Sequence, residues 1–378
     1  MKFRVEREAL ADAVSWAARS LSARPAIPIL AGLLLTVAND RLTISGFDLE
    51  ASTEIELDIA GADAGQALVS GRLLAEITKA LPPHPVDVAL DGSRLGITCA
   101  SSRFTLPTMP VEDYPTLPSM PSTAGTVEAA EFATAVGQVA IAAGRDDTLP
   151  MLTGVRLEID GDRLTLAATD RYRLAVRELT WQPELPGDAE AQVLVPARAL
   201  DGAAKSLAAS ETLTIALSAT PGTGEGIIGF AGSSAGKASR ATTRLLDAAF
   251  PAYQSIVPSE WTSSADIDVG ALTDVVKRVA LVASRNAPVR LEFTEGSLAL
   301  SAGGDEEGRA EEQTEVSFDG EPITTAFNPQ FLLDGLNALG TGRAKMLFTS
   351  PNKPAVLRPE GASGGAYTYV TMPVRMPG

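Results

Sequence analysis

The chain has 378 residues, of which 45% are hydrophobic, and its 47 acidic against 31 basic side chains give a formal net charge of −16. This acidity excludes a protein that grips nucleic acid over its whole exterior, because tight nucleic-acid binding requires a broadly basic face. The single cysteine, Cys99, excludes an internal disulfide framework, while the charged N-terminal segment and the lack of a long apolar run predict a cytoplasmic protein without signal peptide or membrane span.

An amphipathic helix is predicted three times along the chain. Segments that begin at Glu8, Ala130 and Gly270 carry apolar residues at i, i+4, i+7 and i+11, which form one stripe of a helix. Each is followed by apolar residues at period two, which predict a half-buried strand. These alternating runs cover residues 33–37, 155–159 and 289–293.

A second predicted helix also recurs, beginning at Ser70, Pro196 and Asn328, and further alternating strands follow it. Each third of the chain therefore contains the same pattern twice, in the order strand, helix, strands. Proline-rich linkers at 113–125 and 249–264 separate the thirds. We therefore predict an α+β fold of three similar domains, each made of two helix-plus-sheet halves, over residues 1–120, 125–256 and 262–378.

The number of predicted helices bears on how such domains would close into a ring. Six helices spaced by about 10 Å leave a hole of roughly 10 Å, whereas the twelve helices of two chains leave roughly 28 Å. Only the larger hole passes a duplex about 20 Å wide. If the helices line a ring, the ring is therefore expected to contain two copies of the chain, and closed dimers are the commonest oligomers.

Several separate motifs, in the right order over the whole chain, resemble one bacterial family. They are "MKFRVERE", "RPAIPILAGLLL", "SRFTLPTMPVEDYPTLP", "ATDRYRLAV", "FNPQFLLDGLNAL" and the terminal "YVTMPVRMPG". Together they are similar to the DNA polymerase III β subunit, or sliding clamp. The resemblance implies a head-to-tail homodimeric ring with helices inside and sheets outside, around double-stranded DNA.

The resemblance also implies partners and a way of working. The ring would tether the DNA polymerase III α subunit, be loaded by the clamp loader, and bind other proteins that carry a clamp-binding motif. It would have no cofactor and no catalysis of its own. Because a ring holds DNA topologically, weak phosphate contacts suffice and allow it to slide, which agrees with an acidic exterior.

The internal repeat separates residues that serve the fold from residues special to one domain. Asp170 corresponds to Asp48 of the first repeat, so we assign it to a shared turn. Arg171, Tyr172 and Arg173 have no counterparts of their kind, and "TMPV" recurs at 108–111 and 371–374 whereas the Arg375–Met376 terminus does not. The alternative interpretation of Arg171 and Arg173 is a surface pair that forms ion pairs with nearby acidic residues.

The resemblance joins these unique segments into one pocket for short partner peptides. Its apolar floor of aliphatic residues and methionine would suit several partners, and arginines at its rim would orient them. Ser255, at a position often basic in relatives, and the Pro377–Gly378 extension depart from the family pattern. The pocket would include Leu152, Thr169, Arg171, Arg173, Leu174, Pro251, Ile256, Phe331, Val370, Met372, Pro373, Arg375 and Met376.

Basic residues in and beside the repeated helices are candidates to face DNA. For each of them alone, a solvated helix position is an equally good interpretation. The group comprises Arg24, Arg72, Lys79, Arg198, Lys205, Lys277 and Arg278.

The main alternative class is an enzyme, but the sequence contains few of the residue patterns that a catalytic site requires. His84 stands in a proline-rich turn, and no Cys/His cluster offers metal ligands. "GSSAGKAS" from Gly232 lacks the glycine spacing of a phosphate loop, so we expect a hairpin tip there. The acidic residues 305–307, together with Glu311 and Glu312, offer weak cation binding as an alternative, but we interpret them as a solvated acidic loop. A third class is an acidic, ring-shaped scaffold for protein interactions that never encircles DNA.

Overall fold

A computed structural model describes residues 1–22, 25, 27–184, 190–219, 226–234, 236–284, 287–304, 308–361 and 367–375. Arg24, residues 305–307 and Met376–Gly378 of the candidate segments lie outside these described residues. None of the helices in the described ranges is long and apolar enough to cross a membrane.

The six repeated helices are confirmed. The apolar stripe of each faces inward, as at Phe132 and Val136, which are fully buried. Asp268 and Asn328 accept amide hydrogen bonds at the starts of the helices that follow them, which supplies partners to otherwise orphaned donors. The helices are α1 (Arg7–Ala17), α2 (Gly71–Ala80), α3 (Ala129–Ala140), α4 (Ala197–Leu207), α5 (Val269–Val279) and α6 (Pro329–Ala338).

The strands of the described residues form three antiparallel sheets. The first has the order β14 (Gln182–Pro183), β10 (Thr123–Glu128), β16 (Thr212–Ala219), β17 (Gly226–Ser234), β18 (Lys237–Arg244), β4 (Ala51–Asp58), β3 (Arg41–Phe47), β2 (Gly32–Ala38), β6 (Gly65–Ser70), β9 (Ser102–Met109), β8 (Arg94–Cys99), β7 (Val86–Asp91), β1 (Lys2–Val5) and β5 (Ala60–Asp63). The second has the order β15 (Glu190–Pro196), β11 (Gly154–Asp160), β12 (Arg163–Thr169), β13 (Arg173–Thr180), β27 (Thr368–Thr371), β26 (Ala355–Pro359), β25 (Arg343–Phe348), β19 (Ser263–Asp268) and β23 (Ser317–Gly320). The third has the order β22 (Gly308–Glu315), β21 (Ser297–Gly304), β20 (Val289–Thr294) and β24 (Ile323–Phe327).

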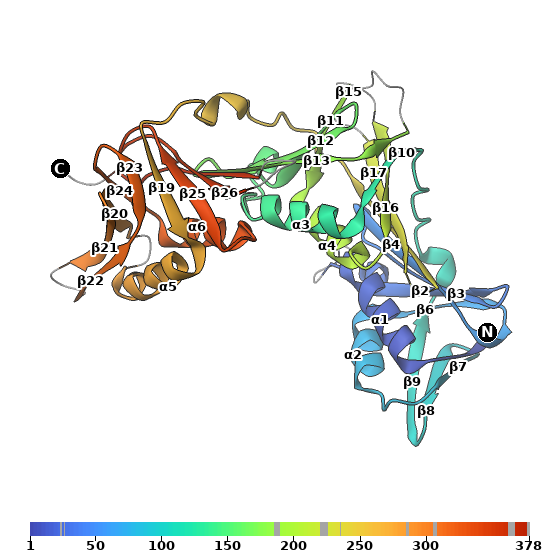
Figure 1. Cartoon of the computed structure of the whole chain (residues 1–378). Coiled ribbons are helices and arrows are strands. Elements are labelled where there is room, and N and C mark those ends of the chain that lie inside the picture. The colour runs from blue at the N-terminus through green and yellow to red at the C-terminus, as the bar shows by residue number, and fades with distance from the viewer. Residues whose placement is uncertain are drawn as a thin grey trace. The chain divides into compact units, whose positions relative to one another are not determined.

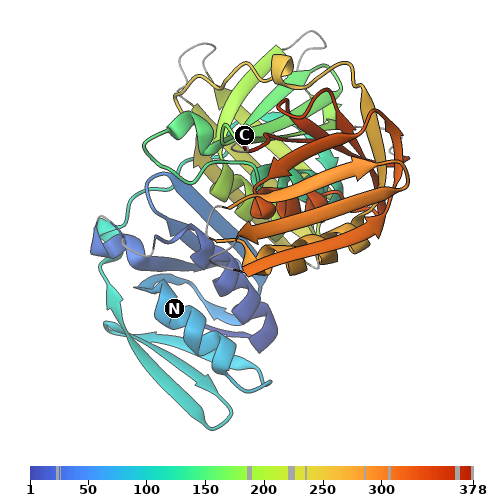
Figure 2. The ribbon, with the colours of Figure 1, turned by 90° about the vertical axis from the view of Figure 1, so that its left-hand side faces the viewer.

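The described chain packs as two compact units, and the middle repeat is shared between them. The first unit holds the first repeat together with 198–247, and the second holds 134–180 together with the third repeat. In the first unit α1 and α2 pack side by side and contact β4 and β2 of the sheet; in the second, α5 and α6 pair beside the third sheet (Figures 1 and 2).

Two strand pairs join neighbouring repeats within these units. β18 of the middle repeat pairs with β4 of the first, with Thr243 opposite Ala51. β27 of the third repeat pairs with β13 of the middle one, with Thr371 opposite Arg173. The middle and third repeats thus each donate their last strand to the preceding repeat, a long-range connection that local sequence patterns do not reveal.

Cys99 is a fully buried residue of β8. Two smaller predictions from the sequence are also confirmed. His84 lies in an exposed bend. "GSSAGKAS" spans the tip of the β17–β18 hairpin, where Ser234 pairs with Lys237.

Candidate peptide-binding site

The turn between β12 and β13 repeats the turn of the first repeat in detail. Asp170 Oδ1 accepts hydrogen bonds from the amides of Tyr172 and Arg173, both at 3.0 Å. Asp48 accepts the same pair of bonds from its own turn. Arg171 has a φ of 79°, and the corresponding residue of the first repeat has a φ of 80°. Asp170 therefore belongs to a shared turn, as the sequence predicts.

A groove of about 210 Å³ runs beside this turn, where β13 pairs with β27 and the linker after the middle repeat passes by. All of its lining residues belong to the predicted peptide pocket. They are Thr169, Arg171, Arg173, Leu174, Pro251, Ile256, Val370 and Met372.

A second hollow, of about 640 Å³, shares Arg171 and Arg173 with the groove and extends to α6. It brings Leu152 and Phe331 of the predicted pocket to the same place. It also adds residues that sequence reasoning did not select: Ala143, Gly144, Arg145, Asp146, Leu149, Asp170, Tyr172, Gln330 and Asp334.

The floor of the groove is an apolar cluster contributed by three segments. Leu174 from β13 and Val370 from β27 are almost completely buried, together with Tyr253 from the linker. Ile256 packs against this cluster. An apolar floor with an open mouth suits aliphatic side chains of a bound peptide.

Arg173 lies in the floor of the site and not at the rim where we expected it. Its side chain is only 8% exposed, and its guanidinium bonds Asp170 at 2.9 Å and Asp334 at 2.5 Å. It also lies over the ring of Phe331, 4.6 Å from the ring centroid. Arg173 therefore connects the turn of the middle repeat to α6 of the third, and its donors already have partners in the protein.

Burial and charge keep these groups in their ordinary ionisation states. Burial alone lowers the pKa of a guanidinium, but Tyr369, Asp334 and Asp170 hold the pKa of Arg173 above its ordinary value. Burial raises the pKa of Tyr253 to about 12, with a contribution from the charge of a nearby glutamate. The site therefore contains a permanent cation between two carboxylates, beside neutral phenols.

The rim of the site is formed by different side chains. Arg171 is exposed, and its guanidinium lies 5.9 Å from the ring centroid of Tyr172. Tyr172 is 56% exposed and stacks on Phe331 with ring centroids 6.2 Å apart. Beside them, the pKa of Asp146 is lowered chiefly by hydrogen bonds from Thr148, with a smaller contribution from Arg171.

The C-terminal residues of the predicted pocket are only partly placed beside it. The amide of Met372 donates to the carbonyl of Tyr172 at 2.8 Å, which fixes the tail against the turn. Pro373 is half-buried and Arg375 is exposed, and neither lines the two hollows. Met376 lies outside the described residues.

The sequence could have indicated Tyr172 and Asp334, two lining residues that the predicted pocket did not include. Tyr172 sits between the two arginines that the internal comparison singled out. Asp334 stands where the second helix of the middle repeat has Gly202, so the same comparison applied to the helices would have found it.

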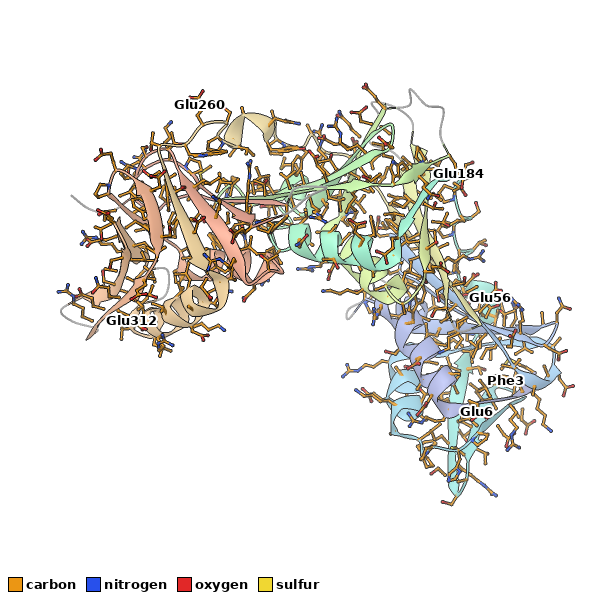
Figure 3. The ribbon with its side chains drawn as sticks, viewed as in Figure 1. Phe3, Glu6, Glu56, Glu184, Glu260 and Glu312 are labelled. Atoms are coloured by element: carbon orange, nitrogen blue, oxygen red, sulfur yellow. The ribbon has the colours of Figure 1, made fainter. Side chains whose placement is uncertain are left out.

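The candidate DNA-facing residues all lie on exposed helix positions, except Arg24, which is outside the described residues. Three of them are already paired with acidic side chains: Arg72 with Glu76, Lys205 with Asp201, and Arg278 with Glu312 of β22. Figure 3 labels Glu312 at the end of the second unit. Lys79, Arg198 and Lys277 make no ion pair within the described ranges. These three are therefore the candidates most available to phosphate.

Three repeats of two helices and antiparallel strands, joined by last-strand exchange, define a DNA-clamp class of fold. Known proteins agree with this assignment. Residues 1–118, 126–252 and 254–375 match, in turn, the N-terminal, central and C-terminal domains of the DNA polymerase III beta subunit family. The chain belongs to this family.

Individual relatives match over nearly the whole length of the chain. A beta sliding clamp of Streptomyces coelicolor is 52% identical over 100% of both chains, and one of Proteus mirabilis is 30% identical over 100% of both. The crystal structure of the DNA polymerase III subunit beta from Pseudomonas aeruginosa superposes with a TM-score of 0.87 at 27% identity over 100% of both chains. That of the Thermotoga maritima subunit gives 0.88 at 26% identity, also over 100% of both.

Proposed function

We propose that two copies of this chain close head to tail into a ring around double-stranded DNA and tether a replicative DNA polymerase to it. The chain is a sliding clamp by family, and the ring, its partners and its lack of catalysis are the parts that we infer. The domains of this ring are residues 1–120, 125–256 and 262–378.

The observation that supports this proposal is that β9 and β22, unlike β18 and β27, have edges without a strand partner from another repeat within the described residues. β18 and β27 each pair with the preceding repeat, but β9 of the first repeat pairs with no strand of another repeat within the described residues. Within the described ranges, residues 102–107 of β9 pair only with β8, and β22 pairs only with β21. β22 is the third repeat's counterpart of β4 and β13. Pairing β9 of one copy with β22 of the next supplies both missing partners, and a second such junction closes a dimer.

The two inner junctions also predict a register for this pairing. Thr371 of the shared "TMPV" lies opposite Arg173, and Thr108 is its counterpart in the first repeat. The β21–β22 register makes Gly308 the counterpart of Arg173. Thr108 itself already pairs with Val69 of β6, but the same register continued into the open part of β9 places Thr105 opposite Glu311 of the other copy.

Side chains at the two surfaces are complementary. Leu73 and Phe104 of the first repeat are exposed, and so is Leu281 of the third, at 83%. Exposed apolar groups on two different domains suit a head-to-tail contact. The basic Arg103 on β9 would lie near the acidic residues of β22, among them Glu312 (Figure 3).

A cysteine pair tests the register directly. In a Thr105→Cys/Glu311→Cys variant, mild oxidation should give a covalent dimer, because opposed strand residues lie within disulfide range. A Thr105→Cys/Glu312→Cys variant is the matched control, since a shift of one residue turns the side chains to opposite faces. Equal cross-linking of both variants, or of neither, would show that this junction is wrong.

The function itself is tested on DNA. A clamp loaded on nicked circular DNA by a bacterial clamp loader should be retained in gel filtration and lost when the circle is cut. A scaffold that never encircles DNA would show no dependence on circularity. Leu281→Asp should weaken both the dimer, measured by light scattering, and retention on the circle.

The two hollows at the β13–β27 junction are the proposed site for partner peptides, which would include those of the DNA polymerase III α subunit, the clamp loader and other motif-bearing proteins. The proposal rests on the apolar floor of Leu174 and Val370 and on the exposed rim of Arg171 and Tyr172. Pro373, Arg375 and Met376 remain proposed members of the site. Lys79, Arg198 and Lys277 are proposed to face DNA, with Arg24, Arg72, Lys205 and Arg278.

A further inference from the structure

The second helices of the first and middle repeats carry cations at the same two positions. Arg72 and Lys79 of α2 correspond, by the repeat, to Arg198 and Lys205 of α4. All four side chains are exposed. The corresponding positions of α6 hold neutral amide side chains. The first two repeats therefore share a basic helix face that the third repeat lacks.

Each of these two helices also carries a single carboxylate, which holds one of its two cations. On α2, Arg72 donates to Glu76 at 3.2 Å, and on α4, Lys205 donates to Asp201 at 2.8 Å. The other cation of each helix makes no ion pair with the residues that the structure describes. Each helix thus combines two positive charges with one negative charge, although the acid stands beside a different cation in the two cases.

Helix stability does not account for the ion pair on α2. A cation in the first turn of a helix opposes the helix dipole, and an acid four residues after its cation is the weaker of the two charge orders. Arg72 and Glu76 have both of these features. Their side chains are 90% and 64% exposed, so the pair contributes little to folding. The carboxylate of Glu76 therefore acts mainly on the charge of this surface.

The middle repeat has no acid at the position of Glu76. Gly202 stands there, four residues after Arg198, and a Cβ added to Gly202 would meet no atom within 4 Å. An acidic side chain at this position would therefore fit beside Arg198. The two helices form a matched pair, in which the acid is present beside one arginine and absent beside the other.

We propose that Glu76 and Asp201 limit how tightly α2 and α4 hold DNA, because each occupies one cation of its helix and repels phosphate from it. This inference rests on the proposed function, in which the four cations face the duplex. A carboxylate beside a cation cancels most of its attraction for a distant phosphate, since the two charges then act as a dipole. Each phosphate that is not neutralised lowers both the affinity and its dependence on salt. Two of the four cations are held in this way, which keeps the ring weakly bound and free to slide.

The test is the salt dependence of binding to a short fluorescent duplex with free ends, measured by fluorescence anisotropy with the full-length protein. Glu76→Gln/Asp201→Asn should bind about 3- to 10-fold more tightly at low salt, and the slope of log affinity against log salt should steepen by roughly 1–2, as expected for one or two additional phosphate contacts. Asp58→Asn/Asp160→Asn is the matched control. It removes the same charge from exposed ion pairs at the ends of β4 and β11, so its affinity and slope should equal those of the wild type.

The reciprocal variant Gly202→Glu gives α4 the acid of α2. It should weaken binding by about 3-fold and flatten the slope, whereas the neutral Gly202→Gln should not. Arg198→Gln removes a proposed DNA contact and tests the proposed function itself. If Arg198→Gln binds as the wild type does, the helices do not face DNA, and the proposed function fails together with this inference. If Arg198→Gln weakens binding but Glu76→Gln/Asp201→Asn binds no more tightly than its control, or Gly202→Glu binds as Gly202→Gln does, only this inference is overturned.

Discussion

Arg173→Ala tests whether the ion pairs of Arg173 stabilise the contact between the middle and third repeats. The substitution leaves Asp170 and Asp334 without their cation, although these carboxylates are 16% and 25% exposed. Loss of one partner from a fully buried ion pair costs about 3–5 kcal/mol, and the partial exposure reduces this, so we expect a loss of about 2–4 kcal/mol in unfolding free energy. For a cooperative unit of 150–250 residues, a loss of that size lowers Tm by roughly 4–16 °C.

The assay is differential scanning calorimetry together with titration of a labelled clamp-binding peptide. From the sequence alone, Arg173→Ala would weaken the peptide through lost hydrogen bonds and leave Tm unchanged, since the arginine would lie at the rim. The buried position predicts instead that Tm falls, and that peptide affinity falls because the floor of the site is no longer held.

Arg163→Ala is the matched control, because Arg163 also pairs with an acidic residue three positions away but is 56% exposed. Exposed pairs contribute about 0–1 kcal/mol, so its Tm should barely change. A double-mutant cycle with Asp334→Ala should show a favourable coupling between the two side chains. If Arg173→Ala destabilises the protein no more than Arg163→Ala does, the stabilising role of Arg173 between the two repeats is refuted.

Three further predictions concern other parts of the chain. Charge reversal at Lys79, Lys205 and Lys277 together should reduce loading and retention on circular DNA while light scattering still shows a dimer; unchanged retention at low salt would mean that they do not face DNA. Because the folded pKa of Tyr253 is raised to about 12, its stabilising contribution is complete below pH 10 and is lost as pH rises towards 12. Denaturant titrations should therefore show that the Tyr253→Phe variant loses less unfolding free energy than the wild type between pH 10 and 12, by at most about 2–3 kcal/mol. Met376→Ala should weaken a bound peptide by about 1–2 kcal/mol in the same titration with no change in Tm, if the partner buries that side chain; equal affinity would remove Met376 from the site.

The sequence by itself determined the elements and their repetition. Helices α1, α3 and α5 follow from one apolar stripe each, and the strands from alternation, because both patterns are set by residues a few positions apart. The comparison of repeats also identified the shared turn at Asp170 and the unusual residues of the middle domain. These are local features, which are visible without knowing what lies across the fold.

Only the tertiary structure decided what those unusual residues do. Arg173 was expected at a rim because nothing near it in sequence could show that Asp334, 161 positions later, would meet its guanidinium. The same holds for the hollow of about 70 Å³ that Ala51 and Gly202 line, because it forms only where α4 lies beside the first repeat. Such contacts depend on strand exchange between repeats, and its partners are selected by packing over the whole domain, which no short stretch of sequence contains.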